Sequence, residues 1–164
     1  MKTIYIIRHG KSSWEADFVE DIDRALTERG VRDAYTMGKR LSDRKLIPEI
    51  IYSSPANRAM HTAIIMARVM EIPEENIFMK RGLYMAYKGD IKNIIDNAPE
   101  KISSLAIFGH NPSFGSLVNK FIKEPLENFP TSGVAVLSFD TESWKDISPE
   151  NVISEHLDCP KKKW

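Results

Sequence analysis

The stretch from Lys2 to Trp14, KTIYIIRHGKSSW, decides the fold that we expect for this chain. It begins with β-branched and aromatic residues, a pattern typical of a strand buried on both faces, and then reaches Arg8, His9 and Gly10. In open α/β sheets, ligands bind at the carboxyl ends of the strands. Arg8 and His9 are therefore candidate site residues, provided that other segments bring partners to the same edge.

Composition indicates one domain with no general affinity for nucleic acid. A chain of 164 residues with 42% hydrophobic and 28% charged residues can bury a full core, so we expect a single domain over residues 1–164. Lys and Arg together number 23, as do Asp and Glu, so no basic field would attract nucleic acid. An anion site would have to be a local cluster.

The apolar runs of this sequence are short. Ile4 to Ile7 is too short for the core of a signal peptide, and no later run approaches the length of a membrane span. We therefore expect a cytoplasmic protein with no membrane partner. The single cysteine, Cys159, has no Cys or His neighbours at a metal-binding spacing, so we expect an ordinary thiol.

The pattern of the first strand recurs twice along the chain. A second short apolar run, Ile50 to Tyr52 within residues 49–53, leads into a helix that we expect to carry Pro55 and Arg58 in its first turn. A third run at residues 105–108 is followed by His110 and another helix. Each junction between strand and helix therefore presents an arginine or a histidine.

The remaining elements complete an alternating α/β pattern. Thr27 is predicted to cap an amphipathic helix that ends near Lys45, and Asp90 to cap a helix that Pro99 ends. The acidic segment from Glu15 to Asp23 lacks periodicity and is predicted to be a loop across the edge where Arg8 and His9 emerge. Further strands are expected at residues 77–79, 134–139 and 152–157.

The three junctions should meet at one edge of the sheet. Parallel strands joined by right-handed crossovers place their carboxyl ends together, so Arg8, His9, Arg58 and His110 are expected to converge. Paired guanidinium N–H groups fit phosphoryl oxygens, and a neutral imidazole beside them can act as a nucleophile. The cluster therefore predicts a site for a phosphoryl group.

Three blocks of the sequence occur in a fixed order: Arg8-His9-Gly10 with Ser12 and Trp14, then Ser54-Pro55 with Arg58-Ala59 and Thr62-Ala63, then Gly109-His110-Asn111-Pro112. These blocks resemble the histidine phosphatase superfamily. The short length, the segment KSSW at 11–14 and the segment DIDRALTERG at 21–30 are similar to its SixA phosphohistidine phosphatase branch. The resemblance runs from Lys2 to about Phe139.

The resemblance implies an α/β fold, a three-layer α/β/α sandwich around a mostly parallel sheet, as in phosphoglycerate mutase-like proteins. It implies that His9 is the nucleophile that becomes phosphohistidine. Arg8 and Arg58 would hold the phosphoryl oxygens, and His110 would place a second imidazole on the phosphate. No metal ion and no cofactor are implied.

Two departures from the wider superfamily bear on the substrate. Many mutase-like members have Asn where this chain has Glu15, and residues 83–86 lack the glutamate that those members use as a general acid. An ester needs such a proton donor, whereas the P–N bond of a phosphoramidate weakens once its ring nitrogen is protonated. This favours a phosphohistidine substrate. Asp21 is our candidate for a replacement donor, with Glu15 and Asp17 in the same loop.

Ser12 and Asn111 are further candidate phosphate-binding residues, although Asn111, like Ser54, also suits a turn. The expected partner is a phosphorylated protein. Three functions remain open from the sequence. The favoured one is a metal-independent phosphatase that acts on phosphohistidine. The alternatives are a phosphomonoesterase or mutase of small phosphorylated metabolites, and a phosphate-binding module without turnover.

Overall fold

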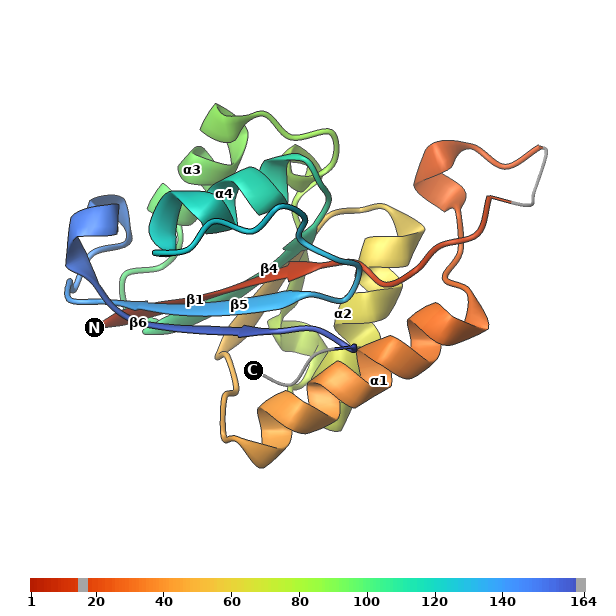
Figure 1. Ribbon diagram of the computed structural model, residues 1–164, viewed down its shortest axis with the longest axis horizontal. Coiled ribbons are helices and arrows are strands. Elements are labelled where there is room, and N and C mark those ends of the chain that lie inside the picture. The colour runs from red at the N-terminus through yellow and green to blue at the C-terminus, as the bar shows by residue number, and fades with distance from the viewer. Residues whose placement is uncertain (15–17, 162–164) are drawn as a thin grey trace.

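A single mixed sheet forms the centre of the structure (Figure 1). The computed structural model describes residues 1–14 and 18–161, the side chain of Lys88 excepted. Within these residues, the sheet has six strands in the order β3-β2-β4-β1-β5-β6. Their bounds are β1 (Lys2–Arg8), β2 (Ile50–Ser53), β3 (Ile77–Met79), β4 (Ser104–Gly109), β5 (Val134–Phe139) and β6 (Val152–Asp158).

The sheet is mostly parallel, which confirms the prediction. β4 pairs in parallel with both β1 and β2, and β2 pairs in parallel with β3. β5 is antiparallel to β1, and β6 is antiparallel to β5. The carboxyl ends of β1, β2 and β4 therefore lie side by side at one edge.

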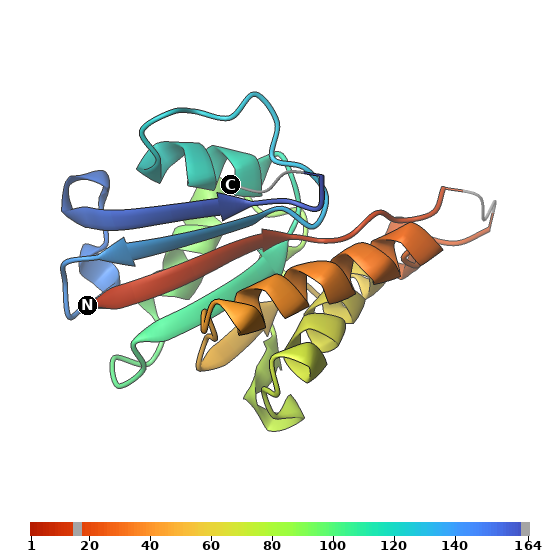
Figure 2. The same cartoon turned by 60° about the horizontal axis from the view of Figure 1, so that its bottom comes forward.

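Two pairs of helices cover the two faces of the sheet (Figures 1 and 2). α1 (Glu28–Asp43) and α2 (Asn57–Val69) pack on the face that Tyr5 and Ile7 of β1 present. α3 (Lys88–Asp96) and α4 (Ser113–Phe121) pack on the face of Ile4 and Ile6. Because alternate residues of β1 enter different cores, the run is apolar throughout, and the three-layer sandwich is confirmed.

Two helix starts differ from the predicted ones. Thr27 caps α1 as predicted, and its hydroxyl accepts the N–H of Gly30. α2 begins at Asn57, so Pro55 precedes the helix because the Ser54 hydroxyl accepts the N–H of Ala56 and forms a turn there. The predicted position of Pro55 in the first helical turn was wrong.

The start of α3 is the second correction. Tyr87 occupies the N-cap position, and Asp90 lies three residues later, inside the helix. The Asp90 carboxylate reaches back to accept the N–H of Tyr87 at 3.0 Å. Asp90 thus stabilises the first turn from inside the helix, and its predicted position at the N-cap was wrong.

Residues 9–14 run out beyond the sheet after β1, and a short 3-10 turn, η1 (Asp21–Asp23), precedes α1 (Figures 1 and 2). Residues 9–14 are fastened to the start of α1. The Thr27 N–H and hydroxyl both donate to the carbonyl of Lys11, at 2.9 and 3.2 Å. Gly30 lies so close that a Cβ atom there would stand 2.3 Å from the same carbonyl oxygen.

Among residues 1–14 and 18–161, none of the helices combines the length and the apolar composition that a membrane span needs.

Gly30→Ala tests this close approach. The added methyl group has no room because the obstacle is backbone, so we expect the free energy of unfolding to fall by about 2 kcal/mol. Urea denaturation measures the change. Gly89→Ala in α3 is the matched control, since nothing lies within 4 Å of its Cβ position and it should be neutral or stabilising by up to about 1 kcal/mol. Equal stability of both variants would contradict the tight contact.

Candidate active site

A pocket of about 200 Å³ opens at the carboxyl edge of the sheet. The four side chains that the sequence predicts to converge all line it. Hollows elsewhere are larger, one of about 560 Å³ beside α3 and α4, but the described residues that line it include no histidine or arginine. The pocket at the sheet edge is lined by Arg8, His9, Lys11, Ser12, Trp14, Arg24, Arg58, His110, Asn111 and Thr131.

His9 follows β1 directly and is 7% exposed. Its Nδ1 atom donates to the carbonyl of Gly10 at 2.7 Å, since a carbonyl only accepts. The proton is thereby fixed on Nδ1, and Nε2 keeps a free lone pair. Burial, then the charges of Arg58 and Arg8, lower the pKa of His9 to about 4, although the bond to Gly10 opposes the shift. The ring is neutral at neutral pH and suited to nucleophilic attack.

His110 follows β4, and its ring centroid lies 5.1 Å from that of His9. Its Nε2 atom is 2.8 Å from the Ser54 hydroxyl, which already accepts the N–H of Ala56 and can therefore donate its own proton. Burial, then the neighbouring His9, lowers the pKa of His110 to about 3. Two neutral imidazoles thus share one pocket.

The two arginines reach the pocket from different elements. Arg8 ends β1 and donates to the carbonyl of Phe129 at 3.0 Å. Arg58 lies in the first turn of α2, is 5% exposed, and donates to the Asp21 carbonyl at 2.7 Å and to its carboxylate at 3.1 Å. The Thr62 hydroxyl accepts the N–H of Gly10 and donates to the carbonyl of Arg58, which joins the first turn of α2 to the loop of His9.

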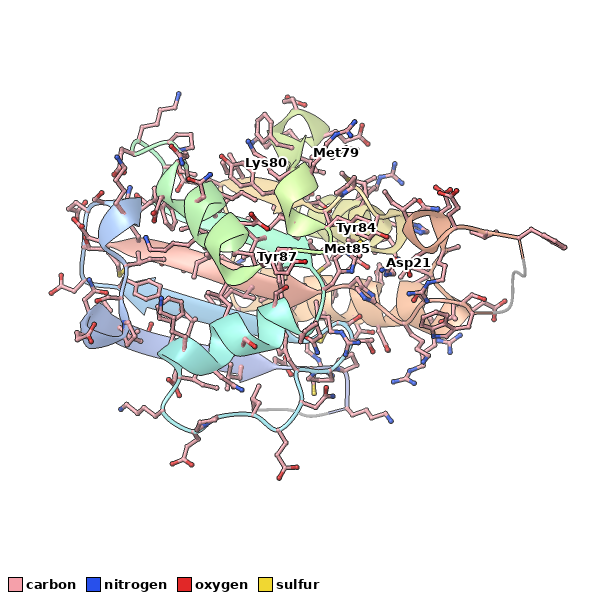
Figure 3. All side chains as sticks on the ribbon, turned by 90° about the horizontal axis from the view of Figure 1, so that it is seen from above. Asp21, Met79, Lys80, Tyr84, Met85 and Tyr87 are labelled. Carbon is pink, nitrogen blue, oxygen red and sulfur yellow. The ribbon has the colours of Figure 1, made fainter. Side chains whose placement is uncertain are left out.

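Asp21 sits in an environment that disfavours the predicted role of proton donor. Its carboxylate accepts from the Tyr84 hydroxyl at 2.7 Å, from Arg58, and from Arg24 Nε at 3.0 Å. Asp21 and Tyr84 are labelled in Figure 3. The bond from Tyr84, followed by those from Arg58 and Arg24, lowers the pKa of Asp21 to about 2. A carboxylate that is ionised at neutral pH has no proton to give, which argues against this role. Proton donation by Asp21 stays a prediction. Glu15 and Asp17 lie outside the described residues.

Ser12 and Asn111 both line the pocket. The Ser12 hydroxyl accepts from Arg24 Nη1 at 2.8 Å. The Asn111 side chain donates to the carbonyl of Phe129 at 2.8 Å and accepts the N–H of Gly115 at 3.1 Å. The amide of Asn111 therefore holds its own loop, and phosphate contacts by either residue stay predictions.

Sequence reasoning gave no role to Arg24, Trp14 or Tyr84. The Arg24 guanidinium carbon lies 3.6 Å from the centroid of the Trp14 ring, and both side chains form pocket wall. The ring of Tyr84 packs edge-on to that of His110 with centroids 5.6 Å apart. The loops that carry these residues lack periodicity, and only the motif blocks of the resemblance contained Arg24 and Trp14.

Comparison with known proteins agrees with this geometry. The sequence profile of the histidine phosphatase superfamily (branch 1) matches residues 4–79. One similar crystal structure is that of a protein from Agrobacterium tumefaciens, provisionally assigned as the phosphohistidine phosphatase SixA. Its sequence is 31% identical to this one, and the two structures superpose with a TM-score of 0.76 over 84% of this chain and 92% of that chain. The chain belongs to the histidine phosphatase superfamily. Within it, the chain is SixA-like.

Two more distant structures share the fold of this histidine phosphatase superfamily member. A protein histidine phosphatase SixA complexed with tungstate is 22% identical, with a TM-score of 0.79 over 96% of this chain and 97% of that chain. A phosphoglycerate mutase from Bacillus anthracis is 16% identical, with a TM-score of 0.68 over 83% of this chain and 87% of that chain. The superfamily membership supports a phosphatase enzyme.

The neutral histidines predict how stability depends on pH. The unfolded chain protonates each imidazole near pH 6.5, whereas the folded protein does so only near pH 4 for His9 and pH 3 for His110. Between these values the unfolded state binds more protons, so stability is complete above about pH 6.5 and falls as the pH drops. The slope approaches about 1.4 kcal/mol per pH unit for each histidine.

Urea denaturation at pH 5 and pH 7 measures this slope. The double variant His9→Gln, His110→Gln is the control, and it should lose the part of the pH dependence that the pair contributes. A wild-type stability that is level over this range, or a slope unchanged in the double variant, would contradict the neutral state of the two rings.

Proposed function

We propose that this protein is a metal-independent phosphatase that hydrolyses phosphohistidine on protein substrates through a phosphohistidine intermediate on His9. The observation that carries the proposal is the state of His9. Its ring is neutral, its Nδ1 proton is held by Gly10, and its Nε2 lone pair is free in a pocket that also holds the guanidinium groups of Arg8 and Arg58.

The proposed reaction has two transfers of one phosphoryl group. The Nε2 atom of His9 attacks phosphorus as the P–N bond to the substrate imidazole breaks, and Arg8, Arg58 and His110 stabilise the charge on the phosphoryl oxygens. The substrate ring, protonated on its other nitrogen, leaves as neutral imidazole. Water then attacks the phosphorus on His9, releases inorganic phosphate and restores the free imidazole.

The lining of the pocket favours a nitrogen leaving group over an oxygen one. Of the described residues, those that line the pocket include no carboxyl group, and Asp21, outside that lining, is held ionised. An alkoxide would leave without a proton donor, whereas a protonated imidazole needs none. The solved relative named as a protein histidine phosphatase supports a phosphorylated protein as the partner.

Rapid-quench labelling tests the intermediate. With radiolabelled phosphoimidazole, the wild-type protein should carry label that is stable to base and labile to acid, as a phosphorylated imidazole is. His9→Ala should carry none, because it lacks the attacking nitrogen. Turnover of phosphoimidazole should exceed that of sugar phosphates. Label retained in His9→Ala would refute the intermediate, and a preference for sugar phosphates would favour a phosphomonoesterase or mutase.

Asp21→Asn separates a positioning role from proton donation. If the carboxylate acts by holding Arg58, kcat/KM should fall by about tenfold for good and poor leaving groups alike, since the phosphoryl contacts suffer equally. A donor would instead be needed most where the leaving group is a poor one. The measurement compares substituted phenyl phosphates with phosphoimidazole, and Asp21→Glu is the control that keeps the charge. A loss confined to poor leaving groups would restore Asp21 as the acid.

A further inference from the structure

We infer that Trp14, stacked against Arg24, forms the surface that binds the aromatic ring of the leaving group. This inference rests on the proposed function and assigns the residue that recognises the ring of the proposed substrate. Nothing in the phosphoryl chemistry above requires an indole. Its presence in the wall of a pocket otherwise dominated by cationic and polar side chains needs a separate explanation.

The exposure of Trp14 is the first observation. The side chain lines the pocket and yet is 75% exposed, whereas Trp144 is fully buried. An indole left in water forgoes the burial that normally stabilises a large aromatic ring. An exposed aromatic side chain beside a candidate catalytic group indicates a surface that a ligand covers.

The second observation is that one face of Trp14 is covered by a side chain that is itself hydrogen-bonded. The guanidinium of Arg24 stacks on the ring, with its carbon 3.6 Å from the ring centroid. Arg24 is in turn fixed by its bonds to the Ser12 hydroxyl and the Asp21 carboxylate, and its side chain is largely buried. Arg24 therefore covers part of the indole and leaves the rest open beside the pocket.

The third observation links this surface to the phosphoryl site. The Asp21 carboxylate that fixes Arg24 also binds Arg58, which is proposed to hold the phosphoryl oxygens. The indole and the phosphoryl site are thus joined by one continuous chain of contacts. A substrate ring joined to phosphorus by a single P–N bond would project from the phosphoryl site toward the wall that Trp14 forms.

The chemistry of the leaving ring suits an indole. Flat aromatic rings stack with a gain of about 0.5 to 1.5 kcal/mol, which corresponds to roughly two- to twelvefold in affinity. A ring that is protonated on its distal nitrogen is also attracted to the negative face of the indole. Trp14 would therefore favour the same protonated form whose P–N bond breaks without a donor.

Two small substrates separate ring recognition from phosphoryl transfer. Phosphoimidazole and phosphoramidate both contain a P–N bond, but only phosphoimidazole carries a ring. Trp14→Ala should raise KM for phosphoimidazole by about fivefold and change that for phosphoramidate by less than twofold. Trp14→Phe should restore most of the preference because it restores a ring. Tyr87→Ala is the control. It removes an exposed aromatic side chain outside the pocket lining and should leave KM for both substrates unchanged.

Imidazole binding gives a second readout. Imidazole should inhibit the wild-type protein in competition with phosphoimidazole and should do so about fivefold more weakly in Trp14→Ala. Equal losses for both substrates, or a loss seen only with a phosphorylated protein while phosphoimidazole is unaffected, would overturn the inference. A wild-type protein that hydrolyses neither P–N compound would overturn the proposed function and the inference with it.

Discussion

The register between three parallel strands is the constraint on which the rest of the structure depends. Arg8 of β1 pairs with Gly109 of β4, and Ser53 of β2 pairs with Phe108, so the three strands end within one residue of one another. The residue after β1 and the residue after β2 each add one more backbone hydrogen bond to β4. The His9 N–H donates to the carbonyl of Gly109, and the Ser54 N–H donates to the carbonyl of Phe108. A slip of one residue would turn β1 over and send its apolar side chains to the opposite cores. The register therefore sets the distance between the two histidines.

Burial and the surrounding charges together keep the imidazole rings of His9 and His110 neutral. The pocket collects Arg8, Arg24, Arg58 and Lys11, and of the described residues only Asp21 places a carboxylate on two of these cations. Burial first, and then the charges of Arg58 and Arg8, lower the pKa of both imidazoles, and the positive charge that remains is available to a dianionic phosphoryl group. The same positive charge thus helps to keep the His9 ring neutral and attracts the phosphoryl group that the ring would attack.

The pocket residues that follow strands could be predicted from sequence, because short apolar runs and their junctions are local signals. Arg8, His9 and His110 directly follow such runs, and Arg58 follows a serine turn. The predicted starts of α2 and α3 differ from the observed ones by two and three residues, since cap geometry depends on which side chain reaches which backbone group. Pro55 and Asp90 both lay in the right segment but on the wrong side of the boundary.

The contacts that surround those residues could not be predicted, because they join segments far apart in the chain. Tyr84 lies 63 residues from the Asp21 carboxylate that it holds ionised, and no periodicity marks either loop. These contacts decide whether Asp21 can donate a proton. The sequence identifies the carboxyl group but does not show whether it is protonated. The stacking of Arg24 on Trp14 is likewise visible only once the loop is folded.

A crystal structure with bound vanadate tests the central claim most directly. The account predicts a vanadium atom within bonding distance of His9 Nε2, with its oxygens contacted by Arg8, Arg58 and His110. Vanadate bound away from His9, or bound at the pocket with the two imidazole rings turned from it, would contradict the account.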